Sequence, residues 1–232
     1  MRAIVAGFDL GSMGRRVADR ARMLAEESDL ELQLIHVLEP VAEAMIEPEL
    51  AKLIRDHERD EARKLADWVR SRASVPVDLE VVNGSPSWTL TQRAKKAPLL
   101  VLGSSTIDNF SVGPVALRVT RMSQTDTLIV RRQPRVPYRR VIAAVDFSEQ
   151  SRVAVEHALE KFPEADVTVL YSLPARFDPL LADAGLFAEE LSASREHRLR
   201  LATDHMEKFA APWGDQVRTQ VVDGPPISTI EE

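Results

Sequence analysis

The sequence predicts two α/β units in tandem, each a doubly wound parallel sheet, and three observations support this fold class. Short apolar runs alternate with stretches of helical spacing along most of the chain. The same ordered set of runs occurs twice, and a segment rich in proline and arginine separates the two occurrences. Alternating strands and helices favour a parallel sheet with right-handed crossovers. A repeat of this kind indicates two copies of one structural unit.

The repeat consists of three matched pairs of segments. Each copy contains an apolar run that ends in aspartate, a second apolar run followed by a proline, and a third run that ends in Gly-x-Pro. The matched pairs are Ile4–Asp9 with Ile142–Asp146, Leu34–Val37 with Val169–Ser172, and Val81–Pro86 with Val221–Pro226. Chance apolar runs would not keep this order, this spacing and the Gly-x-Pro ending together. The aspartates Asp9 and Asp146 therefore occupy equivalent positions.

The elements of the first copy follow from the same pattern. We expect strands at 2–8, 31–38, 77–83, 99–103 and 127–131, and helices at 13–28, 43–72, 87–96 and 113–123. The first three strands are near-continuous apolar runs, which is typical of strands covered on both faces. Pro48 suits a first helical turn, so the second helix is expected to begin properly near that residue.

Two domains and a linker follow from this division: 1–132, 133–139 and 140–232. The segment Arg131–Arg140 contains two prolines and five arginines. Prolines there cannot donate ladder hydrogen bonds, which indicates a linker. Its positive charge also suits an acidic partner, although a solvated linker is the preferred interpretation.

The second copy is shorter than the first. The first copy continues well past Gly84, whereas only a few residues follow Gly224. We expect its fourth and fifth strands and its phosphate loop to be missing, which would leave the strand Val141–Val145 with an unpaired edge. The preferred explanation is that the rest exists in the native protein. A natural truncation and a cover supplied by another subunit are the alternatives.

Composition excludes several classes of function. The chain has 232 residues, 44% of them hydrophobic, a net charge of −6 and no cysteine. The charge argues against nucleic-acid and membrane binding, which call for a basic face. The absence of cysteine excludes disulfides, thiol nucleophiles and Cys-ligated metals. No signal peptide or membrane-spanning run is evident, so a cytoplasmic location is expected. The histidines show no metal-ligand spacing.

Two places in the chain are candidates for a ligand site. Asp9 and Asp146 each end the first strand of a copy, where open parallel sheets bind ligands. Each aspartate is equally explained as the cap of the following helix. The loop Gly103–Ala116 follows a strand and opens a helix, a context that suits phosphate. By pattern alone, an ordinary loop is the better interpretation of that segment.

In the order of these runs and motifs the chain resembles the universal stress protein family, across residues 1–132 and partly across 138–232. The resemblance implies an adenine nucleotide α-hydrolase-like fold with strand order 3-2-1-4-5. It also implies a role in stress survival, often through ATP binding or protein contacts. Domains in this family often pair through their last strands, which implies a homodimer or a pairing of the two domains through Thr127–Val130.

ATP-binding members of the family carry Gly-x2-Gly-x9-Gly-Ser/Thr after the fourth strand, and this sequence departs from that motif. Gly103 and Gly113 match the first and third glycines. Thr106 occupies the place of the second glycine, the intervening loop is about three residues short, and Pro114 replaces the Ser/Thr. Threonine restricts the backbone, and proline removes a hydroxyl and an N–H donor. The first copy therefore resembles the family's weak-binding or non-binding members.

The remaining positions form a candidate pocket for an adenine nucleotide, an adenosine or another small ligand. Its candidate residues are Asp9, His36, Val37, Gly103, Ser104, Thr106, Gly113 and Val115, with Asp146 in the second copy. No general base is paired with a nucleophile or a set of metal ligands, as catalysis requires. A stress-response regulator or small-ligand-binding protein is the favoured function. A weak ATPase or related hydrolase is the alternative, and a dimerisation platform without a ligand is the third.

Overall fold

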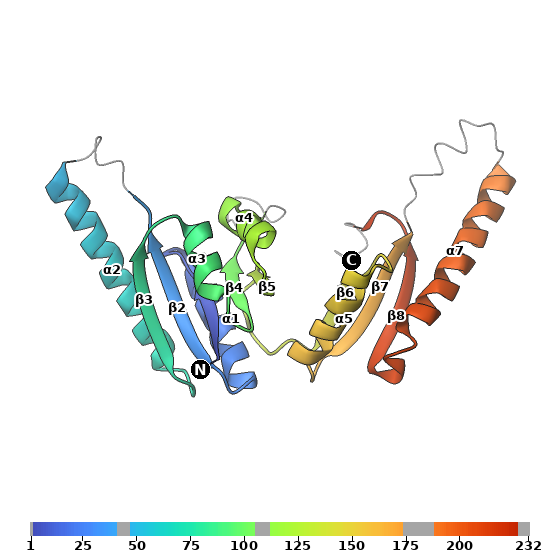
Figure 1. Ribbon diagram of the computed structural model, residues 1–232, viewed down its shortest axis with the longest axis horizontal. Helices are drawn as coiled ribbons and strands as arrows, with labels where there is room; N and C mark the ends of the chain where they lie inside the picture. The colour runs from blue at the N-terminus through green and yellow to red at the C-terminus, as the bar shows by residue number, and fades with distance from the viewer. Residues whose placement is uncertain (1, 41–46, 105–111, 174–187, 227–232) are drawn as a thin grey trace. The chain divides into compact units, whose positions relative to one another are not determined.

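The computed structural model describes residues 2–40, 47–104, 112–173 and 188–226. Contacts within the chain divide it into two units, Met1–Pro137 and Tyr138–Glu232. In each unit, helices pack on a parallel sheet (Figure 1). No helix among the described residues is long and apolar enough to cross a membrane.

The first unit contains a five-stranded sheet in the order β3-β2-β1-β4-β5, and every neighbouring pair is parallel. This confirms the strand order that the family resemblance implies. The strands are β1 (Ala3–Gly7), β2 (Glu31–Leu38), β3 (Val77–Asn83), β4 (Leu100–Gly103) and β5 (Thr127–Val130). The predicted strands 31–38 and 77–83 are confirmed with the same ends.

Four helices accompany these strands: α1 (Ser12–Glu27), α2 (Pro48–Arg70), α3 (Pro86–Ala94) and α4 (Pro114–Met122). Three of them begin at a proline, whose missing N–H is no loss in a first turn and whose fixed φ suits the helix. The expected start of the second helix at Pro48 is confirmed, and residues 43–46 of its predicted range lie outside the described residues.

The sheet of the first unit is covered on both faces. Leu90 of α3 and Val119 of α4 pack against one face, in a cluster with Val5, Ile35 and Leu100 from three strands. Helices α1 and α2 pack against the sheet as well, and the side chains of Met13 and Val17 in α1 lie against Gly103 of β4. Burial on both faces explains why the central strands are apolar without alternation.

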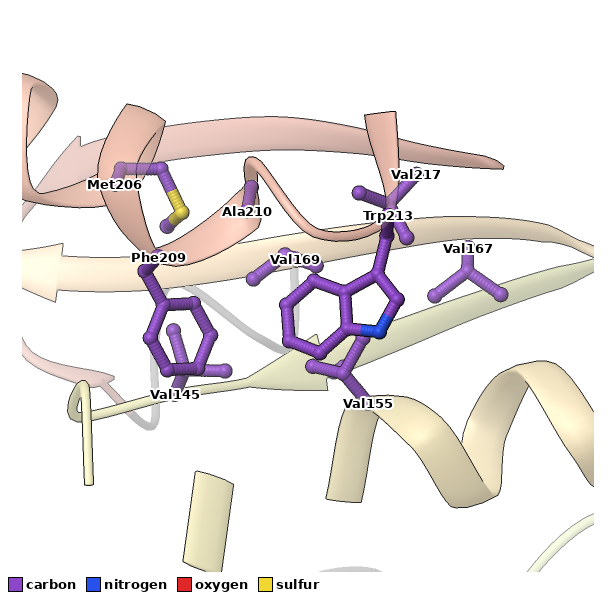
Figure 2. Packing of buried hydrophobic residues seen from close by; sticks show 10 residues of the cluster. Val145, Val155, Val167, Val169, Met206, Phe209, Ala210, Trp213 and Val217 are labelled. Atoms are coloured by element: carbon purple, nitrogen blue, oxygen red, sulfur yellow. The ribbon is translucent and has the colours of Figure 1, made fainter. Parts of the chain in front are cut away.

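The second unit contains a three-stranded parallel sheet in the order β6-β7-β8. Its elements are β6 (Arg140–Ala144), α5 (Glu149–Lys161), β7 (Asp166–Leu173), α7 (Ala188–Ala210), the short 3-10 helix η1 (Gly214–Gln216) and β8 (Val217–Asp223). Figure 2 shows its core, in which Phe209 and Trp213 pack with valines of the sheet and with Val155 of α5. Among the described residues, no strand pairs with the free edge of β6.

The two units repeat the same strand pairing. Ala6 faces Leu34 across β1 and β2, just as Ala143 faces Val169 across β6 and β7. Both third strands are also followed by a glycine of positive φ, Gly84 at 152° and Gly224 at 151°. Only glycine adopts such angles without strain. The repeat seen in the sequence is therefore a repeat of structure.

The segment between the sheets is attached to the first unit. The carbonyl oxygen of Val136 accepts a hydrogen bond of 3.1 Å from Nη1 of Arg20 in α1, and Pro134 is buried. The neighbouring arginines Arg131, Arg132 and Arg135 are exposed. The first unit therefore contacts this segment through Pro134 and the backbone of Val136, and the arginine side chains of the segment face solvent.

Candidate functional site

A cleft of about 480 Å³ lies in the first unit, at the carboxyl ends of β1, β2 and β4. The strand order reverses between β1 and β4, and open α/β sheets bind ligands at this switch point. Residues of α1, α2, α3 and α4 complete the wall. Six of the residues that the sequence analysis proposes line the cleft: Asp9, His36, Val37, Gly103, Ser104 and Val115.

Asp9 is both a wall residue and a helix cap. Its Oδ1 accepts hydrogen bonds from the amides of Gly11, at 3.0 Å, and Gly14, at 2.9 Å. These amides belong to the N-cap and first turn of α1, where backbone N–H groups have no partner within the helix. No described residue donates to Oδ2. The two interpretations of Asp9 are therefore compatible, because one oxygen serves the cap and the other is available at the cleft.

Two glycines keep this part of the cleft compact. A Cβ atom at Gly14 would lie 1.8 Å from the carbonyl oxygen of Asp9. A Cβ atom at Gly103 would lie 2.5 Å from Cγ of Met13 in α1. A side chain at Gly14 would push α1 away from the Asp9 turn, and one at Gly103 would displace the side chain of Met13. Gly14 is thus explained by close packing of a helix on a turn.

His36 is a buried residue of the wall, with 7% of its surface exposed. Its Nδ1 lies 3.1 Å from the carbonyl oxygen of Phe8, and the two rings are 5.4 Å apart. A carbonyl oxygen can only accept, so Nδ1 carries the proton in this pair. Nε2 of the neutral ring is then an acceptor, and it has no hydrogen-bond partner among the described residues.

The start of α4 contributes Val115 and Ala116 to the wall. Gly113 is the N-cap of this helix and is not among the lining residues. The amide of Ser104 donates to the carbonyl oxygen of Val130 at 3.0 Å, which extends the β4–β5 ladder. Thr106 lies outside the described residues.

Asp146 belongs to the second unit and precedes α5, whose N-cap is Ser148, with Oγ accepting a hydrogen bond of 3.2 Å from the amide of Ser151. Its Oδ1 accepts hydrogen bonds from the amide of Ser148, at 3.0 Å, and from the hydroxyl of Ser151, at 2.5 Å. The hydrogen bonds from these two serines lower its pKa to about 2. Asp146 is not part of the cleft wall of the first unit.

Several wall residues were not predicted from the sequence. Glu39 follows β2, Glu58 lies in α2, and Pro86 and Leu90 lie in α3. The Gly-x-Pro ending singles out Pro86, because it places the start of a helix at the end of β3. No signal identifies Glu58, because its place in the wall depends on how α2 packs on the sheet.

The cleft wall is acidic. Its charged side chains are Asp9, Glu39 and Glu58, and none of its described residues is a lysine or an arginine. No group of three or more potential ligands in the described parts of the chain could hold a metal ion. The other wall residues are mainly apolar, which is typical of small-molecule sites.

The first unit is a doubly wound α/β domain with a cleft at the switch point of its sheet. The sequence profile of the Universal stress protein family matches residues 1–131 and again residues 137–232. The chain belongs to the universal stress protein family, and it contains two tandem copies of the family's domain. No curated protein matches the chain.

Solved structures are similar to the whole chain or to about half of it. A universal stress protein from Archaeoglobus fulgidus DSM 4304 is 16% identical, with a TM-score of 0.66 and coverage of 98% of this chain and 79% of that one. A protein of unknown function from Pseudomonas aeruginosa PAO1 is 15% identical, with a TM-score of 0.61 and coverage of 100% and 76%. A universal stress protein in complex with cAMP is 28% identical, with a TM-score of 0.43 and coverage of 56% and 96%. The first two likenesses support the tandem fold.

Proposed function

We propose that this protein is a stress-response regulator that binds a small ligand related to adenine nucleotides in the cleft of its first unit. The observation that carries the proposal is the cleft itself, which lies at the switch point of the sheet and is lined by Asp9, His36 and Gly103. Its volume of about 480 Å³ falls within the range of small-molecule sites. Membership of the family supports a role in stress response or nucleotide binding.

The proposal assigns different tasks to the parts of the wall. Oδ2 of Asp9 accepts a hydrogen bond from a hydroxyl or amino group of the ligand, while Oδ1 keeps the start of α1 in place. Gly103 and Ser104 form the floor at the end of β4, and Val37 and Val115 contribute apolar surface. No base-and-nucleophile pair is assigned, so the protein acts by binding rather than by catalysis.

The departures from the ATP motif predict weak ATP binding. Pro114 begins α4 and has neither a hydroxyl nor an amide hydrogen to offer a phosphate. Thr106 and the short loop add to this expectation from the sequence. Calorimetry should therefore give no sub-micromolar affinity for ATP. A sub-micromolar value would contradict the degenerate motif.

A pair of substitutions at Asp9 tests the site. Asp9→Asn keeps an oxygen for the amides of Gly11 and Gly14 but changes the second oxygen to an amino group. Asp9→Ala removes both oxygens and should cost about 0.5–2 kcal/mol of stability through the lost cap. If Asp9 contacts the ligand, both variants weaken binding, and only Asp9→Ala lowers the melting temperature clearly.

The ligand panel for this test is adenosine, cAMP, AMP and ATP, and native mass spectrometry of protein taken directly from cells identifies any ligand that it carries. Asp78→Asn in β3 is the matched control, since Asp78 is exposed and does not line the cleft. If ligand binding is unchanged in both Asp9 variants, Asp9 acts only as a helix cap and does not contact the ligand.

Self-association through β5 is the second part of the proposal. Among the described residues, β5 pairs with β4 on one side only and ends the sheet, and edge strands invite pairing. The family resemblance supports this surface as the contact. Lysine at Leu128 should convert a dimer to a monomer in analytical ultracentrifugation. A dimer that survives Leu128→Lys would place the contact elsewhere.

A further inference from the structure

We propose that the cleft of the first unit takes an uncharged ligand of the nucleoside type, rich in hydrogen-bond donors, in preference to a nucleotide with phosphate groups. The inference rests on the proposed function, because it specifies the ligand class of the same cleft. Three independent features of the wall carry it: its charge, its backbone amides and the state of His36.

The charge of the wall opposes phosphate. Asp9, Glu39 and Glu58 line the cleft, and no lysine or arginine is among its described lining residues. Like charges repel, and a phosphate in this cleft would meet these carboxylates without a counter-charge among the described lining residues. An uncharged ligand avoids this repulsion.

Three backbone amides near the cleft that might bind a phosphate are already engaged, those of Gly11, Gly14 and Ser104. Phosphates bind at helix N-termini because amides there point at the ligand. In α1, the amides of Gly11 and Gly14 donate to Oδ1 of Asp9, so a carboxylate of the protein occupies the anion position. The amide of Ser104 donates to Val130, and Pro114 has none.

The polar groups of the wall are mainly hydrogen-bond acceptors, which favours a ligand that donates hydrogen bonds. Carboxylates are acceptors when ionised. In the neutral ring, Nε2 of His36 is an acceptor too, because Nδ1 donates to the carbonyl oxygen of Phe8. This nitrogen is buried and has no partner among the described residues, and an unmet buried acceptor is costly. A nucleoside offers hydroxyl and amino donors, and its flat ring suits apolar wall residues such as Leu90 and Leu102.

A charge series of ligands tests the inference on the unmodified chain. Adenosine is uncharged, cAMP carries a single negative charge, AMP about two and ATP more. Calorimetry at low salt, with Mg²⁺ present for ATP, should give affinities that fall along this series, with adenosine at least about tenfold tighter than AMP. AMP or ATP binding as tightly as adenosine would overturn the inference and leave the proposed function standing. No binding by any of the four would overturn both.

Two glutamine variants test the charge directly. Glu58→Gln removes a carboxylate from the wall, whereas Glu49→Gln removes an exposed carboxylate of the same helix that does not line the cleft. Glu58→Gln should raise the affinity for AMP relative to adenosine about threefold, a Coulombic effect of one charge across the cleft. Glu49→Gln should leave the ratio unchanged. A ratio that changes equally in both variants, or in neither, counts against the inference.

His36→Asn tests the acceptor. The asparagine amide can still donate to the carbonyl oxygen of Phe8 from the position of Nδ1, but the atom equivalent to Nε2 is gone. Adenosine binding should weaken about fivefold to tenfold, the value of one hydrogen bond, while thermal melting checks that the fold persists. Unchanged adenosine affinity in a folded His36→Asn variant would contradict the acceptor role and with it this part of the inference.

Discussion

The turns at Asp9 and Asp146 occupy equivalent positions in the two units and hold their carboxylates in different ways. Asp9 bonds to two backbone amides, those of Gly11 and Gly14. Asp146 bonds to the amide of Ser148 and to the hydroxyl of Ser151, which stands where the first unit has Gly14. The carboxylate of Asp9 therefore caps α1 directly, whereas in the second unit the hydroxyl of Ser148 accepts from the amide of Ser151 and caps α5.

The backbone explains how the second turn admits a serine. Phe147 adopts a φ of 65°, in the left-handed region that costs a bulky residue free energy. Its ring packs 4.4 Å from that of Tyr171, the counterpart of His36, and 5.6 Å from that of Phe209. Aromatic packing thus offsets a strained turn in the second unit. The glycine turn of the first unit needs no such strain and lines an open cleft.

The largest expected effect on stability comes from a substitution that introduces, in the turn of the first unit, the serine found at the equivalent position of the second unit. Gly14→Ser places a Cβ atom 1.8 Å from the carbonyl oxygen of Asp9, so α1 must move. We expect a loss of about 3 kcal/mol in the free energy of unfolding of the first unit, as for an overpacked core. Chemical denaturation measures it.

Gly11→Ser is the matched control, because it also introduces the serine that the second unit has at the equivalent position. Its Cβ atom would lie 3.3 Å from Oδ1 of Asp9, and serine is a favoured N-cap residue. We expect its unfolding free energy to stay within about 0.5 kcal/mol of the parent. Equal losses in the two variants would mean that the Gly14 contact does not distinguish the turns.

The first strands of the two units differ in cover. Val5 of β1 is 2% exposed because α3, α4 and β4 cover it, whereas the equivalent Ile142 of β6 is 51% exposed. Val5→Ala should therefore cost about 2 kcal/mol, from two lost methyl groups and a cavity. Ile142→Ala should cost less than about 0.5 kcal/mol. Denaturation of both variants makes the comparison.

A large cost at Ile142 would contradict the exposure of this face in solution. Hydrogen exchange supplies a second readout, since the amides of β6 should exchange faster than those of β1. If β6 is as protected as β1, another segment or another molecule covers the edge of the second sheet.

These comparisons show what sequence patterns can and cannot predict. The ends of β2 and β3 were predictable because each strand is rich in apolar residues and is bounded by turn residues. The equivalence of Asp9 and Asp146 was predictable from the repeat. The left-handed Phe147 was not, because its conformation depends on contacts with residues distant in sequence, such as Phe209. For the same reason Glu58 enters the cleft wall without a local signal.

The smallest expected effect concerns the stability of the second unit at acidic pH. Hydrogen bonds from Ser148 and Ser151 lower the pKa of Asp146 to about 2, from a model-peptide value near 3.8. A lowered pKa means that the ionised form stabilises the fold at pH values above the unfolded pKa. This stabilisation is lost as the pH falls from about 4 towards 2.

In Asp146→Asn the stability of the second unit should therefore depend less on pH in this window. Thermal melts at a series of pH values measure it, with Asp215→Asn at an exposed aspartate as the control. If Asp146→Asn keeps the full acid dependence of the parent, the serines do not hold the carboxylate ionised, and the two caps do not differ in the way described.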